Sequence, residues 1–424
     1  MPFPREELLH HIWKYRLFGS QNLKTVDGLP LEVIRPGEHN TNAGPDFLNA
    51  RIKIGETVWA GNIEIHIRSS DWEKHQHQND KAYENLILHV VYDNDRDESV
   101  GDFPTVELRP FVSDQLLHRY DRLQSNDDDV PCGKQLLEVS ALVRNGWFDS
   151  LLIQRLMRKS SWMMKLVDEL NGDLEQAFLT VVFRSFGMKV NAEPFEQLAR
   201  AIPWKLLAKH QDNIRQLEAI LFGGAGMLEG KPKDPYHEDL KKEYRFLQHK
   251  YQLQPINPIL WRFLRLRPAN FPTVRIAQLA SLFNTTGPFL KWFSNQNETK
   301  DIASLRVETS DYWKTHYQFG KESTIRTKRI GDSMIRGLLI NAVAPFLFVT
   351  AEREAKEELK ERALKLLEGT PAEKNARINA FEQLGLKAAD ATTSQALLEL
   401  RSSYCDHKKC LFCSIGAQLL KKEL

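Results

Sequence analysis

The stretches DFLNARIKI (46–54) and TVWAGNIEIHI (57–67) decide the fold. Both alternate apolar and polar residues over much of their length, which is typical of strands with one buried face. Two further runs, LPLEVI (29–34) before them and NLILHVVYD (85–93) after them, have the same character, and Gly, Asn and Asp residues separate the runs. The sequence therefore predicts four or more strands near the N-terminus.

A helix precedes these strands and a polar segment interrupts them. Apolar residues recur at helical spacing behind Glu6 and Glu7, at Leu8, Leu9, Ile12, Trp13 and Leu17. The polar stretch SSDWEKHQHQNDKAYE (69–84) predicts a loop that leads into a short helix. Residues 1–124 are thus expected to form a mixed α/β module.

The rest of the chain has a different character. SNDDDVP (125–131) predicts an exposed acidic linker, taken as residues 125–134 and ending around Cys132, because consecutive Asp residues before Pro favour neither a helix nor a central strand. Residues 135–400 have helical periodicity in nearly every segment and predict a mostly α-helical domain. Residues 401–424 form a C-terminal segment that contains three of the four cysteines. The expected fold class is α+β.

Charge divides the chain at the same place. Residues 1–131 contain 14 Lys and Arg against 23 Asp and Glu, a net charge of −9, while the remainder has 44 against 33, a net charge of +11. An acidic module can hold metal ions, and a basic partner attracts phosphates. Ordinary variation of charge along a solvated surface is the alternative explanation.

Nothing in the sequence indicates export or membrane insertion. The first residues mix acids and bases and lack the apolar core of a secretory signal. The longest apolar run, residues 337–349, is too short to cross a bilayer and contains Asn341 and Pro345. We therefore expect a cytoplasmic protein that does not enter a membrane; its oligomeric state has no signature in the sequence.

Asp46, Glu64 and His66 are the residues with the clearest chemical potential. Glu64 and His66 are two residues apart in one predicted strand and so point to the same face, and Asp46 begins the strand before it. Two carboxylates that converge in this way suit Mg²⁺ or Mn²⁺, which can activate water beside a phosphate group. His66 could orient the nucleophile or accept its proton. A buried polar network without a metal is the alternative.

Over residues 5–95 this pattern resembles the PD-(D/E)XK nuclease superfamily. Pro45-Asp46 and Glu64 match its Asp and its acid-x-Lys triplet, and Glu7 on the first helix resembles an acidic residue that many members contribute. The resemblance implies a restriction-endonuclease-like module with catalytic residues Asp46, Glu64, His66 and Glu7. His66 departs from the family pattern because it stands where the usual lysine would.

The whole chain resembles a bacterial family catalogued as domain of unknown function 2851, which is common in Bacteroidetes. The stretches that carry this resemblance are NAGPDFLNARI, GNIEIHIRSSDWEKHQHQNDKAY, LILHVVYDND and CLFCSIG. The resemblance implies a bacterial cytosolic setting and one native protein throughout, with little further chemistry.

The polar segment adds a second candidate binding group. His75, His77 and Asp80 are close to His66 in the sequence and could bind a transition metal or contact substrate phosphates. A solvated loop with ordinary hydrogen-bonded histidines is the alternative. His89 lies in an apolar strand and is expected to be a hydrogen-bonded core histidine rather than a ligand.

The cysteines predict a separate metal site. Cys405, Cys410 and Cys413 have C-x4-C-x2-C spacing, and Cys132 would complete four ligands for Zn²⁺ or a [4Fe–4S] cluster, although His407 could replace one of them. The arrangement resembles the iron–sulfur site of some PD-(D/E)XK nucleases, but there the remote cysteine precedes the nuclease motifs and here it follows them. Buried cysteines without a ligand are the alternative.

Two basic groups in the helical domain predict contact with DNA or RNA. WRFLRLRPANFPTVR (261–275) interleaves arginines with aromatic residues, and Arg326, Lys328, Arg329 and Arg336 form the second group. Aromatic core residues with flanking arginines explain the first group equally well.

Three functions follow from these patterns. The first is a metal-dependent nuclease. The second is a catalytically weak nucleic-acid-binding or scaffold protein with a degenerate nuclease fold. The third is a histidine-rich metalloprotein that acts on a small molecule, which would require His75 and His77 to converge.

Overall fold

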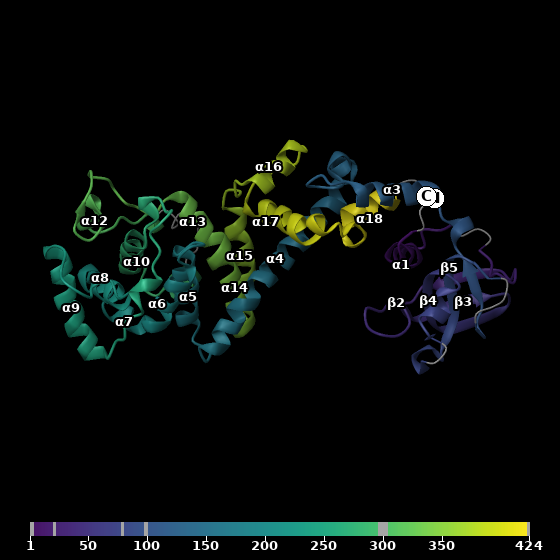
Figure 1. Cartoon of the computed structure of the whole chain (residues 1–424), viewed down its shortest axis with the longest axis horizontal. Coiled ribbons are helices and arrows are strands. Elements are labelled where there is room, and N and C mark those ends of the chain that lie inside the picture. The colour runs from purple at the N-terminus through teal and green to yellow at the C-terminus, as the bar shows by residue number, and fades with distance from the viewer. Residues whose placement is uncertain (1–3, 20–22, 78–79, 97–100, 296–303, 422–424) are drawn as a thin grey trace. The chain divides into compact units, whose positions relative to one another are not determined.

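The two opening stretches form adjacent strands at the centre of a six-stranded mixed sheet. They are β3 (Phe47–Ile54) and β4 (Thr57–Arg68), which pair antiparallel across a tight turn. β4 also pairs in parallel with β5 (Leu86–Asp93), and this combination makes the sheet mixed. Figure 1 shows β3, β4 and β5 side by side. The predicted strands 46–54, 57–67 and 85–93 are confirmed.

Shorter strands extend the sheet on both sides. β1 (Leu31–Arg35) and β2 (Glu38–His39) pair antiparallel with β3, and β6 (Thr105–Glu107) pairs in parallel with β5. The computed structural model describes residues 4–19, 23–77, 80–96, 101–295 and 304–421.

The predicted first helix is α1 (Glu6–Tyr15), which packs against β4. Its apolar residues Leu8, Leu9, Ile12 and Trp13 are fully buried in one core with the sheet. Burying such side chains contributes roughly 1.5–3 kcal/mol each. α1 is thereby fixed beside β4, and its polar residues are held near the strand that carries Glu64.

The same core takes in residues from the end of the chain. α3 (Asp114–Ser125) begins at Ser113, whose hydroxyl accepts a hydrogen bond from the Gln115 N–H. Leu411 and Leu420 lie in the same hydrophobic cluster as α3, α1 and the sheet, and α18 (Ser414–Lys421) packs on α3. The C-terminal segment is therefore part of the sheet-containing unit.

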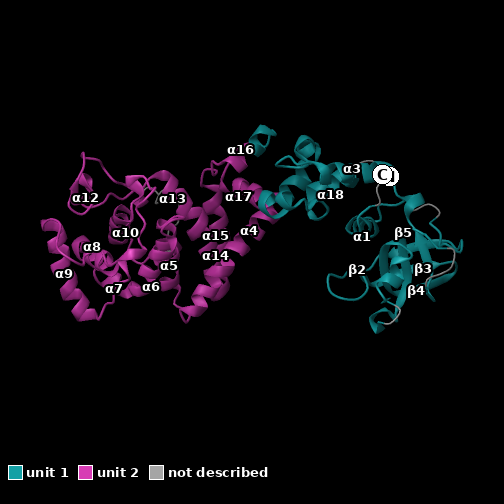
Figure 2. Ribbon diagram, in the orientation of Figure 1, with its two compact units in different colours: residues 1–147, 380–386, 400–424 teal, residues 148–379, 387–399 magenta. Residues whose placement is uncertain are grey.

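The structure accordingly divides the chain differently from the sequence prediction. Unit 1 comprises residues 1–147, 380–386 and 400–424, and unit 2 comprises residues 148–379 and 387–399 (Figure 2). The sequence prediction placed the boundary at the acidic stretch. That stretch is exposed at Asp127, Asp128 and Asp129, as predicted, but Asp127 and Asp129 form ion pairs with Lys408 and Arg401 of the C-terminal segment.

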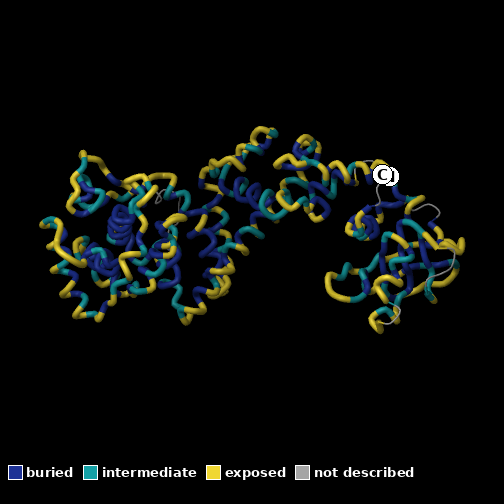
Figure 3. The backbone as a smooth tube through the Cα atoms, in the orientation of Figure 1, coloured by how far each residue is buried: buried dark blue, intermediate teal, exposed yellow. Residues whose placement is uncertain are grey.

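Helices make up nearly all of unit 2. Its main helices, with α4 and α16 shared between the units, are α4 (Ala141–Glu169), α5 (Leu174–Phe186), α6 (Ala192–Ala201), α7 (Trp204–Lys209), α8 (Ile214–Gly224), α9 (Pro235–Tyr251), α10 (Pro272–Thr286), α11 (Phe289–Asn295), α12 (Tyr312–Thr315), α13 (Asp332–Leu338), α14 (Ala344–Glu354), α15 (Glu357–Glu368), α16 (Ala376–Gln383) and α17 (Ala391–Glu399). A short hairpin of β7 (His316–Gln318) and β8 (Lys321–Glu322) was not predicted. α10 is buried along nearly its whole length, as its dark-blue trace shows (Figure 3).

One continuous helical segment, Asp332–Glu354, is long and apolar enough to cross a membrane. Its most apolar window is 78% buried inside the structure, as in the core helix of a folded domain. The segment contains a π-helical turn at Leu339–Val343, which lies between α13 and α14.

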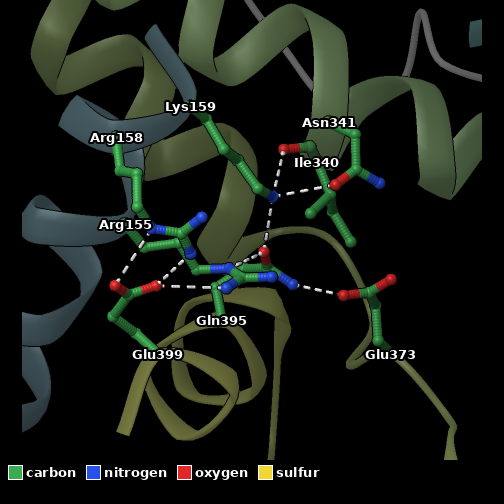
Figure 4. Close-up of polar contacts among 8 residues, drawn as sticks. All are labelled: Arg155, Arg158, Lys159, Ile340, Asn341, Glu373, Gln395 and Glu399. Atoms are coloured by element: carbon green, nitrogen blue, oxygen red, sulfur yellow. Dashed lines mark hydrogen bonds and ion pairs between the residues drawn. The ribbon is translucent and has the colours of Figure 1, made fainter. Parts of the chain in front are cut away.

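A buried polar network joins α4 to α17 within unit 2 (Figure 4). The carboxylate of Glu399 lies 3.2 Å from Arg155 and 2.5 Å from Arg158. Beside it, the Lys159 ammonium donates to Gln395 Oε1 at 2.7 Å and to Asn341 Oδ1 at 2.8 Å. Burial, together with the nearby charge of Arg155, lowers the pKa of Lys159 to about 7.

Candidate metal centres

Hydrogen bonds from backbone N–H groups to the two carboxylates hold Asp46 and Glu64 together. The Asp46 N–H donates to Glu64 Oε2 at 3.1 Å, and the Ile65 N–H donates to Asp46 Oδ2 at 2.9 Å. Each carboxylate is thus held by the backbone of the other strand. β3 contains a bulge between Phe47 and Ala50, directly after Asp46, and bulges often redirect side chains near functional sites.

Two histidines lie against the free oxygen of Glu64. His66 Nε2 is 3.5 Å and His77 Nε2 is 3.3 Å from Glu64 Oε1. His75 completes the group, because one ring nitrogen from each of His66, His75 and His77 lies within 4.8 Å of the others. The structure therefore brings the predicted residues His75 and His77 to the predicted Glu64 and His66, so that they form one site.

Helix α1 contributes a second group beside the first. One ligand atom from each of Glu6, His10 and Asp46 lies within 4.8 Å of the others, and His10 Nε2 is 3.3 Å from Asp46 Oδ2. The sequence prediction chose Glu7 as the acidic residue of this helix, but Glu7 is exposed and lies outside both groups. Successive helical residues differ by about 100° in direction, so only one of two adjacent acids can face the sheet.

His10 was not predicted. The available signal was its i, i+4 spacing from Glu6, which places both residues on one face of the helix.

Two other predicted residues have supporting positions. Asp80 is exposed, and its carboxylate accepts from the Ala82 N–H at 2.9 Å, which caps the short 3₁₀ helix Lys81–Tyr83. Asp80 therefore caps this helix and lies outside both groups of candidate ligands. His89 is fully buried in β5, and its Nε2 lies 2.9 Å from His66 Nδ1. This contact fixes the ring of His66, as outer hydrogen-bond partners do for metal-binding histidines.

Electrostatics at the two groups favour a bound cation. Burial, together with the charge of Asp46, raises the pKa of Glu64 to about 9. Burial raises the pKa of Glu6 as well. Burial and the neighbouring histidines lower the pKa of His66 to about 2, which keeps its imidazole neutral. A bound metal ion stabilises imidazoles in their neutral form, and it compensates the charges of carboxylates that lie close together.

The buried ring nitrogens provide a direct test of fit. Among the described residues, His10 Nε2 and His77 Nε2 are buried atoms without a hydrogen-bond partner, although each lies 3.3 Å from a carboxylate oxygen. Unpaired buried polar atoms are rare in folded proteins and call for an explanation. Their position among carboxylates and further imidazoles fits divalent metal ions. This number of nitrogen donors suits Mn²⁺, Fe²⁺, Co²⁺ or Zn²⁺ better than Mg²⁺.

The four cysteines of unit 1 converge elsewhere, around one small cavity. Cys132, Cys405, Cys410 and Cys413 all line it, and all four thiols are free. Burial and the neighbouring thiols raise the pKa of Cys132 to about 12 and that of Cys410 to about 11. His407, considered as an alternative ligand, is exposed and does not line the cavity.

The C-L-F-C-S-I-G motif has a specific geometric role at this cavity. A side chain at Gly416 would place its Cβ atom 2.2 Å from the carbonyl oxygen of Cys410, so only glycine allows α18 to start this close to the cysteine loop. Burial raises the pKa of the Cys413 thiol, and the backbone N–H groups of Gly416 and Ile415 partly offset this effect. Such donors stabilise a thiolate.

Fold and sites together define an α+β protein with a histidine- and carboxylate-rich candidate metal centre on a mixed sheet and a cysteine cluster from distant parts of the chain. The chain belongs to the family described as "Protein of unknown function (DUF2851)", whose model matches residues 6–376. The matched range includes the whole sheet and ends before the three C-terminal cysteines. Comparison with curated proteins and with solved structures gives no match.

Proposed function

We propose that unit 1 is a metal-dependent hydrolase that cleaves phosphodiester bonds in nucleic acid. The observation that carries this proposal is the convergence of Asp46 and Glu64 with the histidine group. The net charge of +11 after residue 131 supports a polyanionic substrate, because basic proteins attract the phosphate backbone.

In this proposal the metal ligands are Asp46, Glu64 and His77. Glu6 and His10 supply further ligands from helix α1. A divalent cation bound there supplies an activated water and neutralises charge that develops on the phosphate. The ring of His66 is fixed by His89, so its Nε2 is placed to accept a hydrogen bond from the nucleophilic water and orient it. His75 is exposed at the edge of the group and is placed to contact a substrate phosphate.

The cleavage assay uses purified full-length protein with Mn²⁺ and a panel of single-stranded, duplex and branched DNA and RNA. We expect cleavage by the wild type and a loss of at least a hundredfold in Asp46→Ala, because the metal would lose a ligand. Glu56→Ala is the matched control, since Glu56 is exposed in the turn between β3 and β4 of the same module and lies outside the metal groups. Equal cleavage by wild type and Asp46→Ala would contradict the proposal.

A second candidate function has its own supporting observation. His66, His75 and His77 converge, and three imidazoles are a ligand set that zinc uses in catalytic sites. Hydrolysis of a small phosphate or carboxylate ester, with no cleavage of any nucleic acid in the panel, would favour this candidate. Metal binding without any hydrolysis would favour a nucleic-acid-binding or scaffold protein that kept the module.

We also propose that the cysteine cluster holds a metal that stabilises unit 1. All four thiols line one small cavity, and four thiolates are a complete ligand set for Zn²⁺ or for a [4Fe–4S] cluster. Elemental analysis of anaerobically purified protein should find zinc or iron; protein with neither metal would refute the proposal.

A further inference from the structure

Unit 2 contains a cavity of about 1030 Å³ that none of the candidate metal centres uses. The volume matches that of pockets that bind ligands of nucleotide size or larger. Its walls come from α5, the turn after it, α10, the segment 326–331 and α13. The two basic groups singled out in the sequence meet here, because Arg275 belongs to the first and Arg326, Lys328 and Arg329 to the second.

The lining of this cavity is cationic. Among the described residues it includes six basic side chains and no Asp or Glu. They are Arg184, Lys189, Arg275, Arg326, Lys328 and Arg329. Arg184 is paired with Glu196 at 2.6 Å, so its charge is partly neutralised. We refer to this cavity as the cationic pocket.

Arg275 is the buried member of the cationic pocket, at 8% exposure. Its guanidinium donates to Asn270 Oδ1 at 2.7 Å and to Gln278 Oε1 at 2.8 Å, which are both neutral acceptors. Its Nε is buried and has no hydrogen-bond partner among the described residues. Burial lowers its pKa to about 10, so the group is still charged at neutral pH. A buried cation with only neutral partners is unfavourable unless an anion compensates it.

The remaining contacts hold the pocket in place. Gln278, which accepts from Arg275, also donates to the carbonyl oxygen of Arg329 at 3.1 Å. The Lys328 ammonium is buried on backbone carbonyl groups and lies 4.1 Å above the Tyr317 ring. The loop that carries Arg326 and Arg329 is therefore fixed from inside, while these two side chains are exposed. Tyr317 and the partly exposed Trp162 offer aromatic surface in the same lining.

We propose that the cationic pocket binds phosphate esters, as a nucleotide or as the backbone of a nucleic-acid strand. Several arginines from separate segments fit a ligand with more than one phosphate, since guanidinium groups pair with phosphate through two hydrogen bonds. The aromatic side chains fit bases, which stack on such surfaces. The pocket lies wholly in unit 2, so its binding of phosphate esters does not depend on whether unit 1 cleaves nucleic acid.

The experiment measures binding by the full-length protein without added divalent cation. The probes are a fluorescein-labelled 12-nucleotide single strand, as DNA and as RNA, followed by fluorescence anisotropy, and ATP followed by calorimetry. The double variant Arg326→Ala/Arg329→Ala removes two exposed cations from the pocket. The matched control, Lys242→Ala/Arg245→Ala, removes two exposed cations from α9, outside the pocket.

We expect the pocket variant to bind the probes at least tenfold more weakly than wild type. In a plot of log affinity against log salt concentration, the magnitude of its slope should be smaller by about two. The α9 control should remain within twofold of wild type. Tighter binding of the strand than of ATP identifies a strand as the ligand, and the reverse order identifies a nucleotide. Failure of wild type to bind any probe, or an equal loss in the α9 control, would overturn the proposal.

Discussion

Replacing Glu64 by Gln should make the metal-free protein more stable while removing its metal. In the folded, metal-free protein the buried carboxyl of Glu64 keeps its proton far above the usual pH, because burial and Asp46 disfavour its charge. Glutamine resembles the protonated form and cannot ionise. Its carbonyl can accept from the Asp46 N–H as Glu64 does, so the link between the two strands is retained.

The magnitude follows from the two pKa values. The pKa rises from 4.5 for an unperturbed carboxyl to about 9 in the folded protein. Each unit corresponds to about 1.4 kcal/mol, so keeping the proton at pH 7 destabilises the folded state by about 3 kcal/mol. Because the folded pKa is raised, this loss of stability is absent below pH 4.5 and grows as pH rises toward 9. Glu64→Gln should therefore gain about 3 kcal/mol at pH 7 and nothing at pH 4.

Hydrogen exchange of peptides from β4 and β5 measures this difference in unit 1 itself. Metal-free wild type and variant are compared between pH 5 and pH 8, after correction for the intrinsic exchange rate. Glu56→Gln is the matched control, since Glu56 is exposed in the turn between β3 and β4. Mn²⁺ at a hundred times its Kd should stabilise wild type by about 2.7 kcal/mol and leave Glu64→Gln unchanged. A variant that is less stable than wild type at pH 7, or a difference independent of pH, would refute this reasoning.

Three other substitutions test other parts of the structure. Glu399→Ala leaves two arginines of the α4 network without their carboxylate and should cost about 3–5 kcal/mol in urea unfolding of unit 2, whereas Asp239→Ala, from a half-exposed ion pair, should cost less than about 1 kcal/mol. Cys413→Ser should abolish the metal content found by elemental analysis, and a full complement of metal would contradict the assignment of this ligand. Gly416→Ala should lower the metal content and lower the free energy of unfolding by about 1–3 kcal/mol, because the added methyl group meets a backbone carbonyl oxygen. Unchanged thermal unfolding would contradict this prediction and show that the loop can move aside.

The sheet could be predicted because the pattern that specifies each strand lies within one short stretch of sequence. Alternation over residues 46–54 and 57–67 fixes which side chains share a face, and strand order then brings Asp46 beside Glu64. The acidic residue that α1 contributes to the site was predicted one position away, as Glu7 instead of Glu6. Both residues are polar, and the apolar pattern alone does not settle which of them faces the sheet. His10 was missed because its one signal, the i, i+4 spacing from Glu6, is common on amphipathic helices and does not by itself indicate a binding site.

Features assembled from distant segments could be predicted only in part. Cys132 lines one cavity with Cys405, Cys410 and Cys413, a grouping suggested by the count of cysteines alone, and their binding of a metal stays a prediction. The unit boundaries were not predicted, because the C-terminal segment joins the first core through apolar contacts that leave no pattern in the sequence. The cationic pocket was visible only as two separate basic stretches, since the contacts that join them run between residues such as Gln278 and Arg329, which are far apart in the chain.

The interrupted layout of unit 1 sets an order of events during synthesis. The chain leaves unit 1 after residue 147, returns to it briefly at residues 380–386 and completes it from residue 400, so about 250 residues are made before the last segment begins. At roughly 5–20 residues per second this interval lasts on the order of tens of seconds. Throughout it, the nascent chain holds the carboxylates and histidines of the sheet but only one of the four thiols. We therefore expect the proposed metal of the cysteine cluster to be bound only after both units have been translated.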